Sequence, residues 1–279
     1  MAVSVVTGAT GGIGRWIARG LAQAGHHVVL VGQDRTRAEL SQQWISDNVP
    51  SASTEVVLAD LSLLSSTQAL GTEILARHPQ ITVLVNNAGI FDAKRVMTSE
   101  RLERVLATNL LSPVLLSRIL LPALRAGAPS RIVTVGSSTS DSAWLDPERL
   151  MLGNRWTMRR AYAQSKLALM MATFSIANQT KGTGVVANVV HPGLVATGLV
   201  KTNGLVGLAW RCLAKFALTG EQGAASPLFV ALAPEMSDVS GVYVKNRQIV
   251  APNPLALDAA LVNRVWAATQ HLIAKTCDD

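Results

Sequence analysis

The sequence predicts an α/β fold in which one doubly wound parallel sheet forms a single domain over residues 1–279. Three observations support this prediction. A glycine-rich turn joins an apolar strand to a helix near the N-terminus, strand-like and helix-like segments then alternate, and no proline- or serine-rich linker interrupts them. This alternation is typical of a parallel sheet that helices cover on both faces.

The first unit of the chain has the order strand, turn, helix, strand. Residues 2–6 are a short β-branched apolar run, and residues 15–24 have apolar side chains at helical spacing before Gly25, which favours a helix end. Residues 28–31 are a second apolar run. Neither run alternates with polar residues, as expected for strands that are buried on both faces.

Four glycines, Gly8, Gly11, Gly12 and Gly14, occupy the turn of this unit. A diphosphate can reach the backbone amides at a helix N-terminus only where no side chain blocks them, and glycine provides that access. The glycines fit both Gly-x-x-x-Gly-x-Gly and Gly-x-x-Gly-x-x-Gly, and neither is the Gly-x-Gly-x-x-Gly form of ordinary two-domain dehydrogenases. The unit predicts dinucleotide binding.

The later elements continue the alternation. Strands are expected at residues 55–59, 81–85, 131–135, 184–190 and 241–244. Helices are expected at residues 62–78, at 99–125 with breaks at Pro113 and Pro122, around 162–166, and at 255–275. Polar clusters follow the strands at Asp60, Asn86, Ser137 and His191. Because ligands of such sheets bind beyond the carboxyl ends of the strands, these clusters are expected to meet at one edge.

The composition excludes several classes of protein. With 49% hydrophobic and 15% charged residues, the chain is not a disordered one. The net charge of +7 comes from scattered residues, which indicates a solvated surface and no nucleic-acid binding. Cys212 and Cys277 fit neither a metal-ligand spacing nor a disulfide framework, so we expect no metal and a reducing, cytoplasmic location. No signal peptide and no membrane span are expected.

Tyr162 and Lys166 are four residues apart and therefore share one face of a helix. An ammonium beside a phenol favours the phenolate, which lowers the pKa of the phenol. Such a pair can act as a general acid and base on an alcohol or ketone oxygen. The spacing alone is a weak signal, because it occurs by chance on many helices.

Together these motifs resemble the short-chain dehydrogenase/reductase family, single-domain branch, over roughly residues 2–197. The residues that carry the resemblance are Thr7, Gly8, Gly12, Gly14, Asp60, Leu61, Asn86, Asn87, Ala88, Gly89, Asn109, Ser137, Tyr162, Lys166, Pro192 and Gly193. The segment from Trp144 to Ala168 and the sequence His-Pro-Gly at residues 191–193 are similar to retinol-dehydrogenase-like members. The resemblance implies a Rossmann fold.

The resemblance also implies catalytic roles. Tyr162 would give a proton in reduction and accept one in oxidation, Lys166 would lower its pKa and bind the nicotinamide ribose, and Ser137 would bond the substrate carbonyl. Asn109 would hold a water that links Lys166 to solvent. Pro113 has no amide hydrogen, so the carbonyl of residue 109 lacks its helical donor and is free for such a water. The alternative is a simple proline kink.

Cofactor contacts are implied at the glycine-rich turn, at the strand ends and near the catalytic pair. They are Gly8, Thr10, Gly12, Ile13, Gly14, Arg35, Asp60, Leu61, Asn87, Ala88, Gly89, Tyr162, Lys166, Pro192, Gly193 and Thr197. Asp60 would contact the adenine. It could also serve as the N-terminal residue of the following helix.

The choice of cofactor depends on the end of the second strand, where NAD enzymes place an acid. That position is Gly32, and the next one, often arginine in NADP enzymes, is Gln33. We expect NADP(H) rather than NAD(H), with Arg35 as the partner of the 2′-phosphate. The alternative is that Arg35 and Arg37 are solvated residues at a helix start.

Residues 198–235 are expected to form a substrate lid, because Leu205, Leu208, Cys212 and Phe216 have helical spacing on one amphipathic face. A surface helix packed on the core is the alternative. The expected function is an NADP(H)-dependent ketoreductase or alcohol dehydrogenase acting on a lipophilic ketone, aldehyde or alcohol. The second hypothesis is a catalytically idle NADP(H)-binding sensor or scaffold. The resemblance implies a homodimer or homotetramer.

Overall fold

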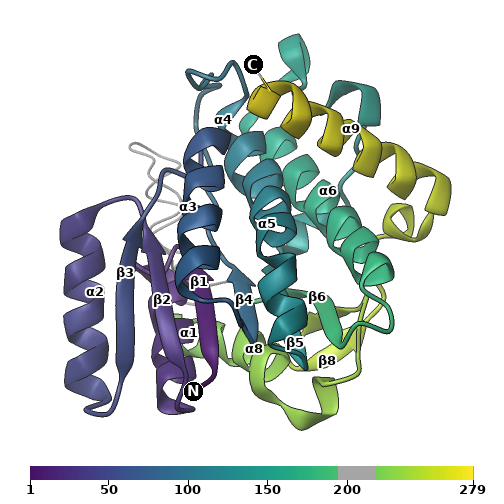
Figure 1. Cartoon of the computed structure of the whole chain (residues 1–279). Helices are drawn as coiled ribbons and strands as arrows, with labels where there is room; N and C mark the ends of the chain where they lie inside the picture. The colour runs from purple at the N-terminus through teal and green to yellow at the C-terminus, as the bar shows by residue number, and fades with distance from the viewer. Residues whose placement is uncertain (194–217, 279) are drawn as a thin grey trace.

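The computed structural model describes residues 1–193 and 218–278, which form one eight-stranded sheet with helices on both faces (Figure 1). The strands are β1 Val3–Thr7, β2 His27–Gly32, β3 Ser53–Leu58, β4 Val83–Asn86, β5 Ser130–Val135, β6 Val185–His191, β7 Tyr243–Lys245 and β8 Gln248–Val250. Their order is β3-β2-β1-β4-β5-β6-β7-β8, and all neighbours are parallel except β7 and β8. The predicted doubly wound Rossmann sheet is confirmed.

The chain reverses its direction of winding between β1 and β4. It first builds β2 and β3 on one side of β1, and then β4, β5 and β6 on the other side. The carboxyl ends of β1 and β4 therefore border the switch point where ligands of such sheets bind. In Figure 1 these ends lie toward the top of the sheet.

The longer helices cover the sheet in two layers. They are α1 Gly12–Gln23, α2 Arg35–Asn48, α3 Leu64–Arg77, α5 Ser112–Ala126, α6 Met158–Gln179, α8 Gly220–Leu232 and α9 Ala259–Asp278. Figure 1 shows α3, α5 and α6 in front of the sheet and α1 and α8 behind it. The central strands are buried on both sides, with Val5, Val29 and Ile132 fully inaccessible, as their unalternating pattern predicts.

Two elements were not predicted from the sequence. Helix α2 buries only Ala38, Ser41 and Ile45, so its apolar signal is weak, but Asp34 caps it by accepting a 2.8 Å hydrogen bond from the Arg37 amide. Strand β8 has only three residues and pairs antiparallel with β7. Such a short strand has no periodic signal.

The predicted helix over residues 99–125 is divided into three parts. The short α4 Arg104–Leu106 leads into a π-helical turn, Ala107–Leu111, which α5 follows. Pro113 is the second residue of α5 and follows the π-helical turn directly, so the helical backbone continues through it although its nitrogen carries no amide hydrogen. Pro122 lies inside α5.

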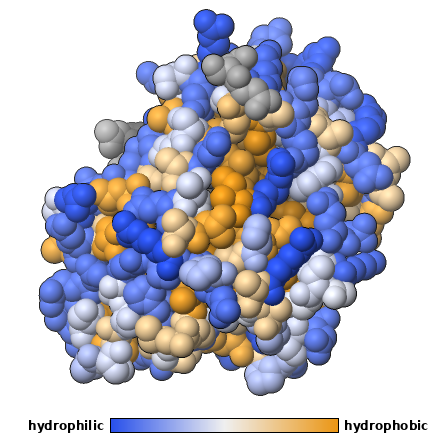
Figure 2. All heavy atoms as spheres, viewed as in Figure 1, coloured by the Kyte–Doolittle hydropathy of each residue, from blue (hydrophilic) through white to orange (hydrophobic). Residues whose placement is uncertain are grey.

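One helical stretch, Arg104–Ala126, is apolar and long enough to cross a membrane, although no span was expected from the sequence. In the structure 72% of its most apolar window is buried inside the protein, as is usual for the core helix of a globular domain. Figure 2 shows that apolar side chains gather at the centre of this helix-covered face, whereas most of its margin is hydrophilic.

The predicted lid segment falls only partly within the described residues. Residues 198–217 lie outside them, so the lid remains a prediction there. The described remainder contains α8, which begins with a capping box between Thr219 and Gln222 and packs against α1, β5 and β6.

Candidate active site

Helix α6 carries Tyr162 and Lys166 to the carboxyl edge of the sheet. Thr157 caps the helix by accepting a 3.3 Å hydrogen bond from the Arg160 amide. The Lys166 side chain is 3% exposed, and its Nζ donates a 2.9 Å hydrogen bond to the Val135 carbonyl at the end of β5. Burial lowers the pKa of Lys166 to about 8. The same Nζ lies 6.0 Å from the centroid of the Tyr162 ring.

The Tyr162 phenol differs from the expectation in one respect. Burial raises its pKa, and a hydrogen bond with Ser137 acts in the opposite direction. The predicted lowering of this pKa by Lys166 is therefore wrong here, because desolvation dominates and the ammonium is directed at the Val135 carbonyl. Phe91 packs edge-on against the phenol ring at a centroid distance of 4.9 Å.

Ser137 lies two residues after the end of β5 and forms a hydrogen bond with Tyr162. Its Oγ accepts hydrogen bonds from the Thr139 amide at 3.3 Å and the Thr139 hydroxyl at 3.0 Å. The neighbouring Ser138 is exposed. Gly136 precedes Ser137, and a Cβ there would lie 2.8 Å from Val189 Cγ1. Close packing with β6 thus explains why glycine precedes this serine.

Asn109 lies in the π-helical turn and is fully buried. Its Oδ1 accepts from the Ile90 amide at 2.8 Å, and its Nδ2 donates to the Ile90 carbonyl at 3.0 Å and to Ser165 Oγ at 3.1 Å. The side chain therefore fixes the loop after β4 against α6. The water predicted on its backbone carbonyl remains a prediction.

Gly89 lies close to both the Lys166 ammonium and the Asn109 side-chain oxygen. A Cβ at Gly89 would lie 3.3 Å from Lys166 Nζ and 3.4 Å from Asn109 Oδ1. The structure therefore brings Asn109, Ser137, Tyr162 and Lys166 together at the sheet edge, although they come from the π-helical turn, from α6 and from the loop after β5.

The glycine-rich turn leaves the first amides of α1 open. Gly8 and Gly12 have positive φ angles of 66° and 52°, and a Cβ at Gly14 would lie 2.2 Å from the Gly8 carbonyl oxygen. Among the described residues, no side chain caps this helix, and its first turn has no acid. An uncapped helix N-terminus without side chains fits a diphosphate. Ile13 is buried in the core, so only its backbone is available for a ligand.

Thr7, for which no separate role was predicted, joins the glycine-rich turn to the end of β4. Its hydroxyl accepts 3.0 Å hydrogen bonds from the amides of Asn87 and Ala88. The Asn87 side chain in turn donates to the carbonyls of Thr7 at 2.8 Å and Gly8 at 3.3 Å. Asn87 therefore holds the glycine-rich turn in place. The position of Thr7 at the end of a strand and directly before the glycine-rich turn could have indicated this role from the sequence.

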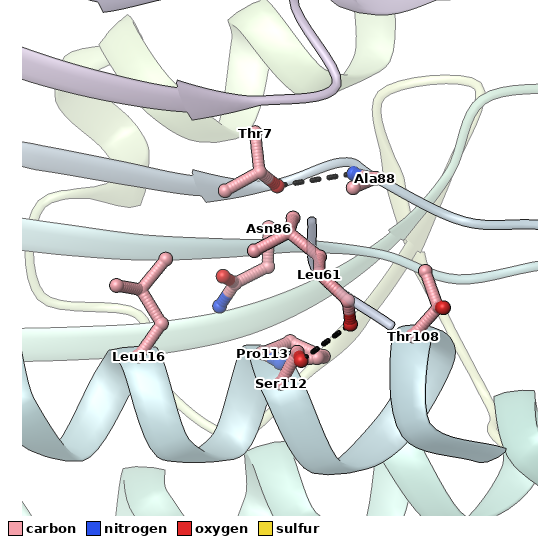
Figure 3. A pocket seen from close by; sticks show the side chains of 8 residues that line it. All are labelled: Thr7, Leu61, Asn86, Ala88, Thr108, Ser112, Pro113 and Leu116. Atoms are coloured by element: carbon pink, nitrogen blue, oxygen red, sulfur yellow. Dashed lines mark hydrogen bonds between the residues drawn. The ribbon is translucent and has the colours of Figure 1, made fainter. Parts of the chain in front are cut away.

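The strand ends also border a small pocket, shown in Figure 3. Its lining residues are Thr7, Leu61, Asn86, Ala88, Thr108, Ser112, Pro113 and Leu116. Asn86 Oδ1 and Thr108 Oγ1 are buried without a hydrogen-bond partner among the described residues. The pocket thus places two of the predicted cofactor residues, Leu61 and Ala88, beside unpaired polar atoms.

Asp60 lies beside this pocket but does not cap α3. Its carboxylate accepts from the Ser62 amide at 2.9 Å and from Gln33 Nε2 at 2.8 Å. Glu100 instead accepts from the first amides of α3, those of Leu64 and Ser65, at 2.6 and 2.9 Å. The capping alternative for Asp60 is therefore wrong, because Glu100 occupies that position.

The two arginines after β2 differ in where they point. Arg35 pairs with Glu39 at 3.6 Å along α2. Arg37 instead places its Nη2 over the glycine-rich turn, 3.1 Å from where a Cβ of Gly11 would lie. Gly32, at the end of β2, packs against the glycine-rich turn. Any other residue there would clash, since its Cβ would lie 2.1 Å from Thr10 Cγ2.

The chain after β6 continues the same edge. Pro192 is buried, and Gly193 has a φ of 89° and would place a Cβ 2.4 Å from Leu218 Cδ1. Thr197, the last predicted cofactor residue, lies outside the described residues.

Comparisons with known proteins identify the family of this chain. Residues 2–205 match the family model described as short chain dehydrogenase. Human retinol dehydrogenase 12 is 32% identical over 271 residues, which cover 97% of this chain and 86% of the relative. Mouse polyprenol dehydrogenase is 36% identical and covers 95% of this chain and 82% of its own length.

Two solved structures share the fold. A crystal structure of an uncharacterised protein from Mycobacterium paratuberculosis has a TM-score of 0.81 and 26% identity, covering 98% of this chain and 93% of that one. A short chain dehydrogenase from Burkholderia cenocepacia in complex with NADP has a TM-score of 0.71 and 25% identity, covering 88% and 95%. The chain is therefore a member of the short-chain dehydrogenase/reductase family of oxidoreductases and resembles its retinol-dehydrogenase-like members.

Proposed function

We propose that this oxidoreductase uses NADP(H) to interconvert a carbonyl and an alcohol on a lipophilic small molecule. The observation that carries the proposal is the grouping of Ser137, Tyr162 and Lys166 at the carboxyl edge of the sheet, beside Gly89. A sensor or scaffold would need the open turn for binding, but not a half-buried phenol with a buried ammonium beside it.

The residues of the chain account for proton transfer. NADPH, when bound, supplies the hydride that the carbonyl carbon accepts. Ser137 donates a hydrogen bond to the carbonyl oxygen, and Tyr162 gives that oxygen its phenolic proton, so that an alcohol forms and a phenolate remains. Burial keeps the Tyr162 phenol protonated before the reaction, but the raised pKa also makes the phenolate costly to form. The Lys166 ammonium, 6.0 Å from the centroid of the Tyr162 ring, attracts the phenolate once it forms and offsets part of that cost, and alcohol oxidation is the reverse.

The open glycine-rich turn fits the diphosphate of a dinucleotide, and Arg37 fits the additional 2′-phosphate of NADP(H). Its guanidinium lies over the turn, whereas Arg35 is 71% exposed and paired with Glu39. We therefore propose Arg37, in place of Arg35, as the residue that selects NADP(H). The NADP bound to the Burkholderia cenocepacia relative supports the same choice of cofactor.

The two arginines supply a matched test of cofactor selection. A charge-assisted hydrogen bond contributes about 1.5–3 kcal/mol, so Arg37→Ala should weaken NADPH binding about 10–100-fold and leave NADH binding unchanged. Arg35→Ala should change neither. Fluorescence titration of each variant with both cofactors measures this directly, and equal losses for the two variants would refute the assignment.

The lipophilic substrate is proposed from apolar side chains at the site and from the relatives. Phe91 lies against Tyr162, and Leu218 lies against Gly193. The similar proteins include a retinol and a polyprenol dehydrogenase. A panel of long-chain and aromatic ketones, aldehydes and alcohols, matched with short polar ones, tests this preference.

The activity itself is tested by following NADPH absorbance with the panel. Tyr162→Phe should lower kcat/KM about 100–10,000-fold, the usual contribution of a general acid, while NADPH binding persists. If the wild type is no faster than Tyr162→Phe on every substrate while both bind NADPH, the sensor hypothesis replaces this one.

A further inference from the structure

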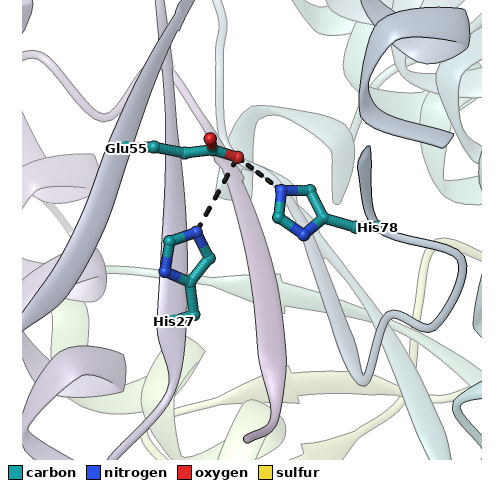
Figure 4. A group of neighbouring side chains, drawn as sticks. All are labelled: His27, Glu55 and His78. Carbon is teal, nitrogen blue, oxygen red and sulfur yellow. Dashed lines mark hydrogen bonds and ion pairs between the residues drawn. The ribbon is translucent and has the colours of Figure 1, made fainter. Parts of the chain in front are cut away.

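Three side chains from separate elements converge at the opposite edge of the sheet, far from the glycine-rich turn. His27 is the first residue of β2, Glu55 lies near the start of β3, and His78 follows the last turn of α3. Figure 4 shows both imidazoles directed at the Glu55 carboxylate. One ligand atom from each lies within 4.8 Å of the others. We call these residues the histidine–glutamate cluster.

The imidazoles present their Nε2 atoms to the carboxylate. His27 Nε2 lies 3.7 Å from Glu55 Oε1, and His78 Nε2 contacts the same oxygen. On its other side, His27 Nδ1 is 2.7 Å from Ser53 Oγ. A serine hydroxyl can accept a hydrogen bond from the Nδ1–H group, which leaves the Nε2 lone pair free for a metal. Histidines that bind metals usually donate their other ring N–H in this way, most often to a carboxylate, a carbonyl or a water.

The spacing of the cluster fits a small ion. Tetrahedral zinc with nitrogen and oxygen ligands holds them roughly 3.3 Å apart, from bond lengths of about 2.0–2.2 Å. The 3.7 Å separation of His27 and Glu55 is close to that value, and His78 must withdraw slightly from Glu55 to admit the ion. The side chains of His27, Glu55 and His78 are only 17, 27 and 15% exposed. Two imidazoles and one carboxylate leave a fourth position for water.

Nearby Arg77 opposes a cation but does not occupy the site. Its Nη1 lies 3.6 Å from Glu55 Oε2, the carboxylate oxygen that faces away from the histidines, and its Nη2 pairs with Glu73 at 2.6 Å. Arg77 is half exposed, so solvent screens its charge. It therefore weakens metal binding without blocking it.

We propose that His27, Glu55 and His78 bind a divalent transition-metal ion of the zinc class. The ion would tie β2, β3 and the end of α3 together, and its role would be structural, because the cluster lies at the amino ends of the strands. No metal was expected from the spacing of the two cysteines, and residues 27, 55 and 78 are too far apart in sequence to form a metal-binding motif. This site is independent of the proposed activity.

The test uses the full-length protein after treatment with a chelator and dialysis. Zn²⁺ should bind with a stoichiometry of one and raise Tm, and Co²⁺ alone should produce the visible d–d bands of a four-coordinate site. His78→Gln and Glu55→Gln should each abolish both effects. Ser53→Ala should weaken Zn²⁺ binding about 10–100-fold, as expected for loss of an outer contact.

His271→Gln is the matched control, because His271 is an exposed histidine outside the cluster. It should retain the wild-type stoichiometry, Tm shift and cobalt spectrum. Circular dichroism of each metal-free variant separates a folding defect from loss of the site. The proposal is overturned if the wild type shows no saturable Zn²⁺ binding, or if well-folded His78→Gln and Glu55→Gln bind as the wild type does.

Discussion

The buried ammonium of Lys166 should make the protein less stable than it would be with an apolar side chain, and this cost should depend on pH. Burial is the only cause resolved for the lowered pKa of Lys166, which falls from 10.5 to about 8. Lys166→Met removes the charge and keeps an unbranched side chain of similar length. We expect the variant to lose activity and, at neutral pH, to lose the cost of burying the charge.

The magnitude follows from the shift of about 2.5 pKa units, the difference between 10.5 and about 8. At 1.36 kcal/mol per unit, the buried charge costs about 3.4 kcal/mol at pH values well below the folded pKa. Lys166→Met removes this cost but also loses the hydrogen bond to the Val135 carbonyl, which offsets about 1–3 kcal/mol of the stabilisation. The net change in the free energy of unfolding at neutral pH is therefore small.

The pH dependence separates these two effects, since the lost hydrogen bond does not titrate. Between the folded and unfolded pKa values the unfolded chain binds more protons, so the stability contributed by this lysine rises with pH. Relative to Lys166→Met, the wild type should gain about 2.5 kcal/mol between neutral pH and about pH 10.

The assay is urea unfolding of both proteins across this pH range, followed by circular dichroism. Groups remote from Lys166 titrate alike in both proteins and cancel in the difference. A difference in unfolding free energy that stays constant with pH would show that Lys166 is not desolvated as its geometry indicates. A difference that moves against the wild type would refute the sign of the argument.

Three further substitutions test the frame around the site. Gly14→Ala places a Cβ 2.2 Å from the Gly8 oxygen, so it should abolish NADPH binding in a fluorescence titration and lower stability by about 1–3 kcal/mol. Asn109→Ala leaves both backbone groups of Ile90 unpaired and should cost about 2–4 kcal/mol in urea unfolding. Tyr243→Phe removes a 3.1 Å hydrogen bond to Asp141 and should cost about 1 kcal/mol by the same measurement, with wild-type NADPH affinity.

The fold could be predicted because its signals are local. Buried parallel strands appear as unbroken apolar runs, and the glycines of the first turn occur together in the sequence. The position of Ser137 followed from the rule that strand ends of a parallel sheet meet at one edge. Tyr162 and Lys166 were identified from their spacing on one helix face and from the family resemblance.

What could not be predicted depends on side-chain direction and burial. The sequence does not show that Arg37 lies over the glycine-rich turn while Arg35 pairs with Glu39. It does not show that desolvation outweighs the neighbouring ammonium at Tyr162. The capping of α3 by Glu100, 36 residues away in sequence, is equally invisible to a local motif.

The hydrogen bonds of Thr7 and Asn87 join the glycine-rich turn and the loop after β4 into one rigid unit. The side-chain Nδ2 of Asn87 would also lie 2.5 Å from a Cβ at Gly14, and the Gly8 carbonyl oxygen would lie 2.2 Å from the same Cβ. Residues 8, 14 and 87 are therefore packed against one another. Substitutions at Gly14 and Asn87 should therefore show strong epistasis in a combinatorial library. A transplant of the glycine-rich turn into another scaffold would have to carry the end of β4 with it.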